Sequence, residues 1–268
     1  MPEKIDSPSF FEPWLQFKQP IVRQLAFCIA SPNILTKIPD DLKIENYFEL
    51  HSNTIWQEHY QAYEVRLQQL DQPPQPLIDF MARLKSTRLG LRFEYLLWFW
   101  LQDDDYHPYQ LLGHSIQKIA GAITRGELDF LLLNKETQEI EHWEVALKYY
   151  LGENELNLSE WFGLNRQDTL QRKLRHFTQR QFQFSETSQY TIQRKFAVMK
   201  GQLYLPEPHY ASSIPEWINT SRRLGQWGTI IPVLPYYRLQ RHEWLCPDQH
   251  PSSQTAECWT NGLYHNAD

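Results

Sequence analysis

Two acidic residues stand inside stretches that otherwise have the composition of buried β-strands. Asp129 is followed by four apolar residues at 130–133, and Glu144 lies between Trp143 and Val145. An unpaired buried charge costs several kcal/mol, so each carboxylate requires a partner. A metal ion is one candidate partner for the two acids. The other is Lys148, which follows Glu144 by four residues.

The residues between the two acids predict a hairpin that brings the carboxylates together. The stretches 127–134 and 139–149 are typical of strands, and NKETQE at 134–139 is typical of a short turn. Pairing through that turn places Asp129 nearly opposite Glu144, within the roughly 5 Å at which like charges repel. A divalent cation removes this repulsion, and two carboxylates with phosphate oxygens and waters suit Mg²⁺, or Mn²⁺ in its place. The structural alternative, in which the acids flank strands and Lys148 pairs with one of them, stays open.

The surrounding elements form a predictable order. We expect helices at 19–30 and 53–70, a helix at 77–102 with a break near 86–90, strands at 115–124, 127–134 and 139–149, a helix at 165–184 and a strand at 194–205. This order predicts a mixed α/β core in which helices cover a sheet.

Three regions are expected along the chain. DQPPQP at 71–76 marks a boundary, so residues 1–76 form a helical accessory region and residues 77–205 form the core. Residues 206–268 are rich in Pro and Trp, which predicts an irregular cap with a short hairpin near 227–240. We expect the three regions to pack as one structural domain.

The helix expected at 165–184 has a narrow apolar stripe. Leu170, Leu174 and Phe177 recur at spacings of four and three, so they mark the buried side. Gln181 continues that side, where a glutamine could contact phosphate or water at a site. The alternative is that Gln181 lies at the fraying end of the helix.

Basic residues gather on the same helix. The chain as a whole has a formal net charge of −6, so any contact with nucleic acid must come from a local basic patch. The alternative is a charged face that contacts only solvent. The candidates for contacts with a phosphate backbone are Arg172, Lys173, Arg175 and Arg180, with Lys200 on the strand that follows.

Other classes of site lack their signatures. The three cysteines show no CxxC spacing, and no HExxH, GxSxG, phosphate-loop or dinucleotide pattern is present. His107, His114 and His142 are therefore expected to be surface or core histidines. The first residues lack the pattern of a secretion signal, and the run at 95–101 is too short to span a bilayer. We expect a cytoplasmic protein without a membrane partner.

The element order and the Asp, acid and lysine pattern resemble the PD-(D/E)XK nuclease superfamily. More closely, the chain resembles an uncharacterised bacterial family, a domain of unknown function assigned to that superfamily. The closer resemblance lies in RGELDFLL at 125–132, HWEVALKYYLG at 142–152, GLNRQDTLQRKLRHFTQRQ at 163–181 and MKGQLYLP at 199–206.

This resemblance implies a restriction-endonuclease-like fold with Asp129 and Glu144 as metal ligands and Glu94, on the leading helix, as an accessory acid. The superfamily lysine usually follows the acid by two residues, where this chain has Ala146. Lys148 lies on the same face, with its Cα roughly 13 Å from that of Glu144 at the rise of an extended strand.

The implied activity is Mg²⁺-dependent hydrolysis of nucleic-acid phosphodiester bonds, with DNA favoured over RNA as the partner. Lys148, Glu94 and Gln181 would assist the chemistry. The alternative is a catalytically inactive module of the same fold that binds nucleic acid or an unknown protein partner.

Overall fold

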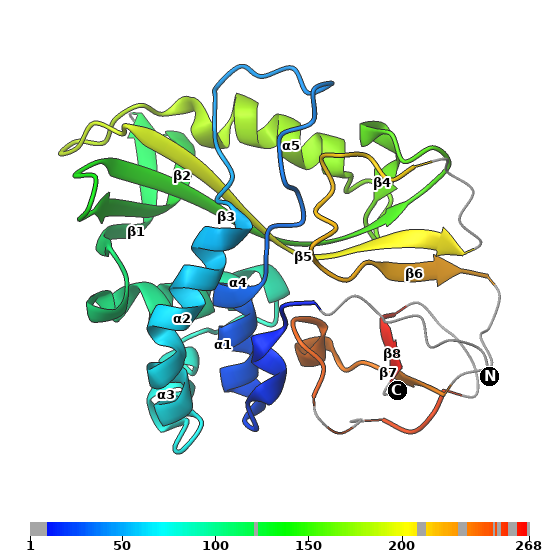
Figure 1. Ribbon diagram of the computed structural model, residues 1–268. Coiled ribbons are helices and arrows are strands. Elements are labelled where there is room, and N and C mark those ends of the chain that lie inside the picture. Colours follow the sequence, from blue (N-terminus) through cyan, green and yellow to red (C-terminus); the bar gives the residue numbers. More distant parts are fainter. Residues whose placement is uncertain are drawn as a thin grey trace.

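A mixed sheet with helices on both faces forms the centre of the protein. The computed structural model describes residues 10–120, 123–207, 213–229, 235–248, 250, 253–256 and 262–266. Five strands follow one another in the order β1–β2–β3–β5–β6, and β4 pairs with β3. In Figure 1, α5 lies on one side of the sheet, and α1, α2, α3 and α4 lie on the other. The predicted mixed α/β architecture is therefore confirmed.

The order of elements agrees with the prediction through the core. The central strands are β1 (Tyr109–Ala120), β2 (Ile123–Asn134), β3 (Ile140–Gly152), β4 (Trp161–Phe162), β5 (Arg194–Glu207) and β6 (Gly225–Gly228). The helices are α1 (Pro20–Ala30), α2 (Asn53–Leu70), α3 (Gln75–Met81), α4 (Leu89–Gln102) and α5 (Leu170–Gln179). The short 3₁₀ helices are η1 (Pro13–Gln16), η2 (Asp104–Tyr106), η3 (Leu158–Glu160), η4 (Gln181–Gln183) and η5 (Arg241–Trp244).

Two predicted helices differ from the observed ones at their ends. The stretch expected as one helix at 77–102 forms α3 and α4, separated near the predicted break. The helix expected at 165–184 begins only at Leu170, because the Thr169 side chain accepts the backbone N–H of Arg172 and caps the first turn. It ends at Gln179, because Arg180 leaves the helical conformation, and Gln181 then begins η4.

The N-terminal helices belong to the same core as the sheet. One large apolar cluster joins side chains of α1, α2, α3 and α4 to one face of β2, β3 and β5. Trp56, Trp100 and Trp143 are fully buried in it, which explains part of the high tryptophan content. A second cluster joins α5 to the opposite face, through Leu170, Leu174 and other residues. The stretch 71–76 therefore connects two helices, α2 and α3, that pack in one core.

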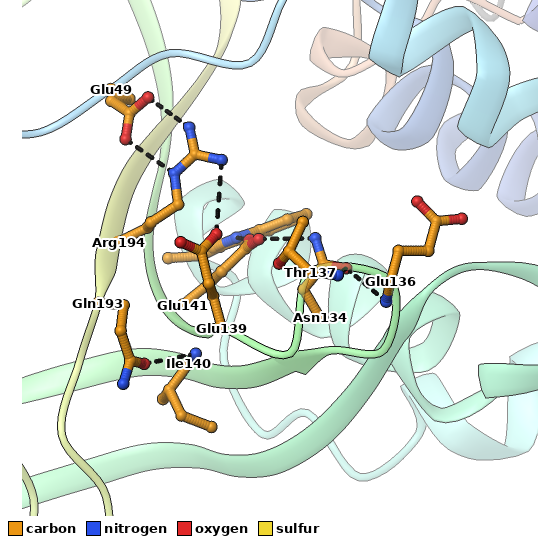
Figure 2. A network of polar contacts seen from close by, with 10 residues as sticks. Glu49, Asn134, Glu136, Thr137, Glu139, Ile140, Glu141, Gln193 and Arg194 are labelled. Carbon is orange, nitrogen blue, oxygen red and sulfur yellow. Dashed lines mark hydrogen bonds and ion pairs between the residues drawn. The ribbon is translucent and has the colours of Figure 1, made fainter.

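The turn between β2 and β3 is held by one asparagine. Asn134 Oδ1 accepts the backbone N–H groups of Glu136 and Thr137 at 3.0 and 3.3 Å. Its Nδ2 donates to Glu141 Oε1 at 2.9 Å, and Trp143 Nε1 donates to the other Glu141 oxygen at 2.7 Å. Figure 2 shows this network beside the turn. The polar contacts fix the register of the hairpin that carries both acids.

The prediction of a short hairpin near 227–240 is wrong. β6 pairs in parallel with β5, with Tyr204 opposite Gly225. A Cβ at residue 225 would lie 2.2 Å from Cδ1 of the Tyr204 ring, so glycine permits this close pairing. β7 (Tyr236–Arg238) pairs instead with β8 (Tyr264–Asn266), near the C-terminus. Both strands thus pair with segments distant in the sequence.

Candidate active site

The two acids meet where β2 separates from β3. The antiparallel ladder runs from Leu133 opposite Ile140 to Phe130 opposite Trp143. Its next step places Asp129 opposite Glu144, as predicted, but no further pair forms. The Asp129 carboxylate instead accepts the Val145 backbone N–H at 2.9 Å. The acid therefore lies at the divergence of the two strands, and its side chain satisfies the next backbone donor of β3.

Glu144 is fully buried, and besides Asp129 two other side chains contact its carboxylate. Nε2 of His142, on the same face of β3, lies 2.7 Å from Glu144 Oε1. Gln181, from η4, donates Nε2 to Glu144 Oε2. Neither partner bonded to the carboxylate is a lysine or an arginine, so the charge of Glu144 is not neutralised by direct contact with either. His142 is itself fully buried, and its Nδ1 has no hydrogen-bond partner among the described residues.

Both carboxyl groups have raised pKa values. For Asp129, burial is the largest cause of the raised pKa, and the charge of Glu144 adds to it, while the Val145 N–H opposes it. For Glu144, burial also raises the pKa, and the positive charge of Lys173 is the largest opposing effect. Two acids this close cannot both ionise easily, so they titrate as a pair. A cation that entered between them would replace a proton.

Lys173 approaches the acids from α5. Its Nζ donates to Gln181 Oε1 at 2.8 Å, and its side chain lies over the Phe177 ring, with Nζ 4.0 Å from the ring centre. Burial lowers the pKa of this ammonium, and the charge of Glu144 partly offsets that effect. Lys173 is therefore turned toward the acids, whereas Arg172 and Arg175 remain exposed.

Lys148 has a different partner. Its Nζ lies 2.6 Å from Asp168 Oδ2, in the loop before α5. The Tyr150 hydroxyl also donates to Asp168, at 3.4 Å. Among the described residues, no hydrogen bond or ion pair joins Lys148 to Asp129 or Glu144. The structure thus brings this lysine to an aspartate that the sequence analysis did not select.

Glu94 lies on α4, close enough to Asp129 for its charge to raise the pKa of that acid. Its Oε1 lies 2.7 Å from His114 Nε2, on β1, and both side chains are largely buried. The His114 ring stacks on Trp98 with the ring centres 4.1 Å apart. The histidines that contact Glu94 and Glu144, His114 and His142, were expected to be surface or core residues without a role at the site. For His142, its position two residues before Glu144 on a strand was the available signal.

The predicted basic contacts fall into two groups. The side chains of Arg172, Arg175 and Arg180 are exposed along α5 and its end. Lys200 is fully buried, donates to the Ser31 carbonyl oxygen and lies 3.4 Å from the centre of the Trp56 ring. The structure contradicts the prediction for Lys200, because residue 200 points from β5 into the helical layer. A phosphate cannot reach it there.

The carboxylates do not form a complete protein cage for a metal. Among the described residues, no group of three or more His, Cys, Asp or Glu side chains is arranged to hold a metal ion. In the same part of the chain, every helix is too short or too polar to cross a bilayer.

Sequence comparison identifies a family for the chain. Residues 23–267 match the family described as Domain of unknown function (DUF1853), and the chain belongs to that family. No curated protein and no solved structure matches the chain.

Proposed function

We propose that this protein is a metal-dependent nuclease that hydrolyses phosphodiester bonds of nucleic acid, with DNA as the favoured substrate. The observation that carries the proposal is the placement of Asp129 opposite Glu144 at the point where β2 leaves β3. The order α4, β1, β2, β3, α5 and β5 supports a restriction-endonuclease-like core, because the acids then occupy the second and third strands after the leading helix.

The residues present fit Mg²⁺ or Mn²⁺. Mg²⁺ usually takes one or two protein carboxylates and completes its shell with waters and substrate phosphate oxygens, so a full protein cage is not required. Asp129 and Glu144 would hold the ion, and Glu94 would act on its outer shell through the nearby charge of its carboxylate. When bound, the metal would polarise a phosphoryl oxygen and lower the pKa of a bound water.

The other side chains of the site would orient groups. His142 holds Oε1 of Glu144, which leaves Oε2 as the oxygen that faces Gln181. Gln181 would exchange this contact for a water or a phosphate oxygen when a cation approaches. Lys148 and Lys173 carry ammonium groups near this part of β3, and one of them would stabilise negative charge that develops on the phosphate. Exposed arginines of α5 would contact the backbone of the substrate.

The experiment that tests this function is a cleavage assay with Mg²⁺ and with Mn²⁺ on single-stranded, double-stranded and branched DNA and RNA. Asp129→Ala is the matched variant, purified in parallel. Cleavage by the wild type that is lost in Asp129→Ala supports the proposal. Cleavage that persists in the variant identifies a contaminating enzyme and contradicts it.

A second function, an inactive module that binds nucleic acid or a protein, is favoured by one observation. Gln181 and His142 already bond to the two oxygens of Glu144, and Lys148 is already paired with Asp168. Mn²⁺ binding separates the two functions. A nuclease binds Mn²⁺ through Asp129, so the affinity falls in Asp129→Asn, whereas an inactive module binds no Mn²⁺ at this site.

A further inference from the structure

We propose that Lys173, on α5, supplies the ammonium that contacts the scissile phosphate, and that Lys148 instead anchors the loop before α5. This inference rests on the proposed nuclease function, because it assigns a residue of that same site. The sequence pattern favours Lys148, which shares a strand face with Glu144. The side-chain contacts favour the lysine from the helix.

Lys148 forms an ion pair with a side-chain carboxylate. Its Nζ lies 2.6 Å from Asp168 Oδ2, and the side chains are 25% and 41% exposed, so the pair lies at the edge of the protein. The Asp168 backbone also belongs to the turn before α5, since its carbonyl oxygen accepts the Gly163 N–H at 2.7 Å. Breaking the ion pair would release this turn from β3. An ammonium with this partner is suited to hold the start of α5 in place.

Lys173 has no such anionic partner. The side-chain group that accepts its hydrogen bond is the neutral Gln181 amide, and no ion pair involves Lys173 among the described residues. Its charge nevertheless acts on both Glu144 and Asp129. A half-buried ammonium beside two acids, bonded to a neutral group, can donate a hydrogen bond to a phosphate oxygen without first breaking an ion pair.

The position of Lys173 follows from the packing of α5. Leu170, Leu174 and Phe177 bury the apolar stripe of the helix against the sheet. Lys173 precedes Leu174 directly, so it borders this stripe, and its ammonium lies over the Phe177 ring. The helix thus directs a long cationic side chain along its buried edge toward β3. Arg172 and Arg175, on either side in sequence, remain exposed.

Gln181 connects metal entry to Lys173. Its Nε2 donates to Glu144 Oε2, and its Oε1 accepts from Lys173. If Glu144 holds a cation, Gln181 would release Oε2, because the positive end of its amide would be repelled by the ion. The same movement would take Oε1 away from Lys173 and leave its ammonium free for a phosphate oxygen.

Three variants test this inference: Lys173→Met, Lys173→Arg and Lys148→Met. We would measure single-turnover cleavage of the best wild-type substrate with Mn²⁺, Mn²⁺ affinity from the electron paramagnetic resonance signal of the free ion, and melting temperature. Lys173→Met should cleave about 100-fold more slowly or worse, the usual effect of losing one charge-stabilising group. Its Mn²⁺ affinity should be unchanged or higher, because a neighbouring positive charge is gone. Lys173→Arg should keep part of the activity.

Lys148→Met is the contrasting variant. It should melt at a lower temperature and cleave within about 10-fold of the wild type once folded. The inference is overturned if Lys173→Met cleaves like the wild type, if it loses Mn²⁺ binding, or if folded Lys148→Met is as inactive as Lys173→Met. A wild type that neither cleaves nor binds Mn²⁺ overturns the proposed function itself, and the assignment of Lys173 with it.

Discussion

The Asp129 carboxylate accepts the Val145 backbone N–H at 2.9 Å, in the position where a neighbouring strand would place a carbonyl oxygen. The β2–β3 ladder ends one residue before this contact. The acid therefore has two roles: it satisfies a donor of β3, and it holds a second carboxyl group close to Glu144. The first role stabilises the fold, whereas the second raises the free energy of the ionised site.

The first prediction concerns pH. The pKa values of Asp129 and Glu144 are raised in the folded state, so the folded protein binds more protons than the unfolded chain above the ordinary carboxyl pKa of about 4. The stability that these two acids contribute is fully present below that value and is lost as pH rises through the folded pKa values. Three buried histidines, at 51, 59 and 142, have pKa values lowered by burial and change stability in the opposite direction. We therefore expect the stability of metal-free wild type, relative to a variant that lacks one of the acid charges, to be lower at pH 8 than at pH 5, and Mn²⁺ to reverse the difference.

The matched variant for this test is Asp129→Asn. Its amide oxygen can still accept the Val145 N–H, but the charge is gone. Without metal, the variant should be more stable than the wild type at pH 8 by about 1 kcal/mol or more, the value of one pKa unit. From pH 5 to pH 8 its melting temperature should fall less, or rise more, than that of the wild type. If the melting temperature changes equally with pH in both proteins, groups other than Asp129 cause the change.

The second prediction concerns Glu141, the buried acid of Figure 2. It accepts from the Asn134 amide and from the Trp143 indole, both of which are buried. Glu141→Ala leaves two buried donors unpaired, and we expect a loss of about 2–4 kcal/mol of unfolding free energy, measured by urea denaturation. Glu139→Ala is the control, because that half-exposed acid meets Arg194 only at 3.9 Å. A similar loss in both variants would contradict the role of Glu141.

The third prediction separates exposed from buried basic residues. Arg175 on α5 and Arg180 at its C-terminal end are exposed, whereas Lys200 is fully buried. Arg175→Ala and Arg180→Ala should each weaken binding to duplex DNA and reduce the slope of log affinity against log salt by about 0.9. Lys200→Met, measured in the same titration on folded protein, should leave that slope unchanged. A changed slope in Lys200→Met would show that a phosphate reaches the buried side of β5.

The fourth prediction concerns Gly201, which pairs with Lys148 across β3 and β5 and has φ +121°. A Cβ there would lie 1.8 Å from the Lys148 carbonyl oxygen. Gly201→Ala should therefore destabilise the protein by about 3 kcal/mol or more. The control is Gly90→Ala in α4, where no atom lies within 4 Å of the added Cβ. It should be neutral or stabilise by up to about 1 kcal/mol. Thermal unfolding of both variants checks the contrast.

Local pattern was sufficient for the parts of the fold whose partners are close in sequence. The bounds of α1 and α2 lie within one residue of the predicted helices, because apolar spacing and a following proline act locally. The placement of Asp129 opposite Glu144 also followed from sequence, since a short turn sets the register of a hairpin. The pairing of β6 with β5 did not, because strand choice there depends on distant segments.

The direction of long basic side chains was decided only by the tertiary structure. The sequence by itself determined that basic residues gather between 172 and 180 and that two acids face each other on a hairpin. It could not separate Lys173 from Arg172 and Arg175, because one helix turn carries all three and packing alone sets which edge meets β3. Likewise, the burial of Lys200 depends on helices far away in sequence, which cover one face of β5 and place Trp56 against its ammonium.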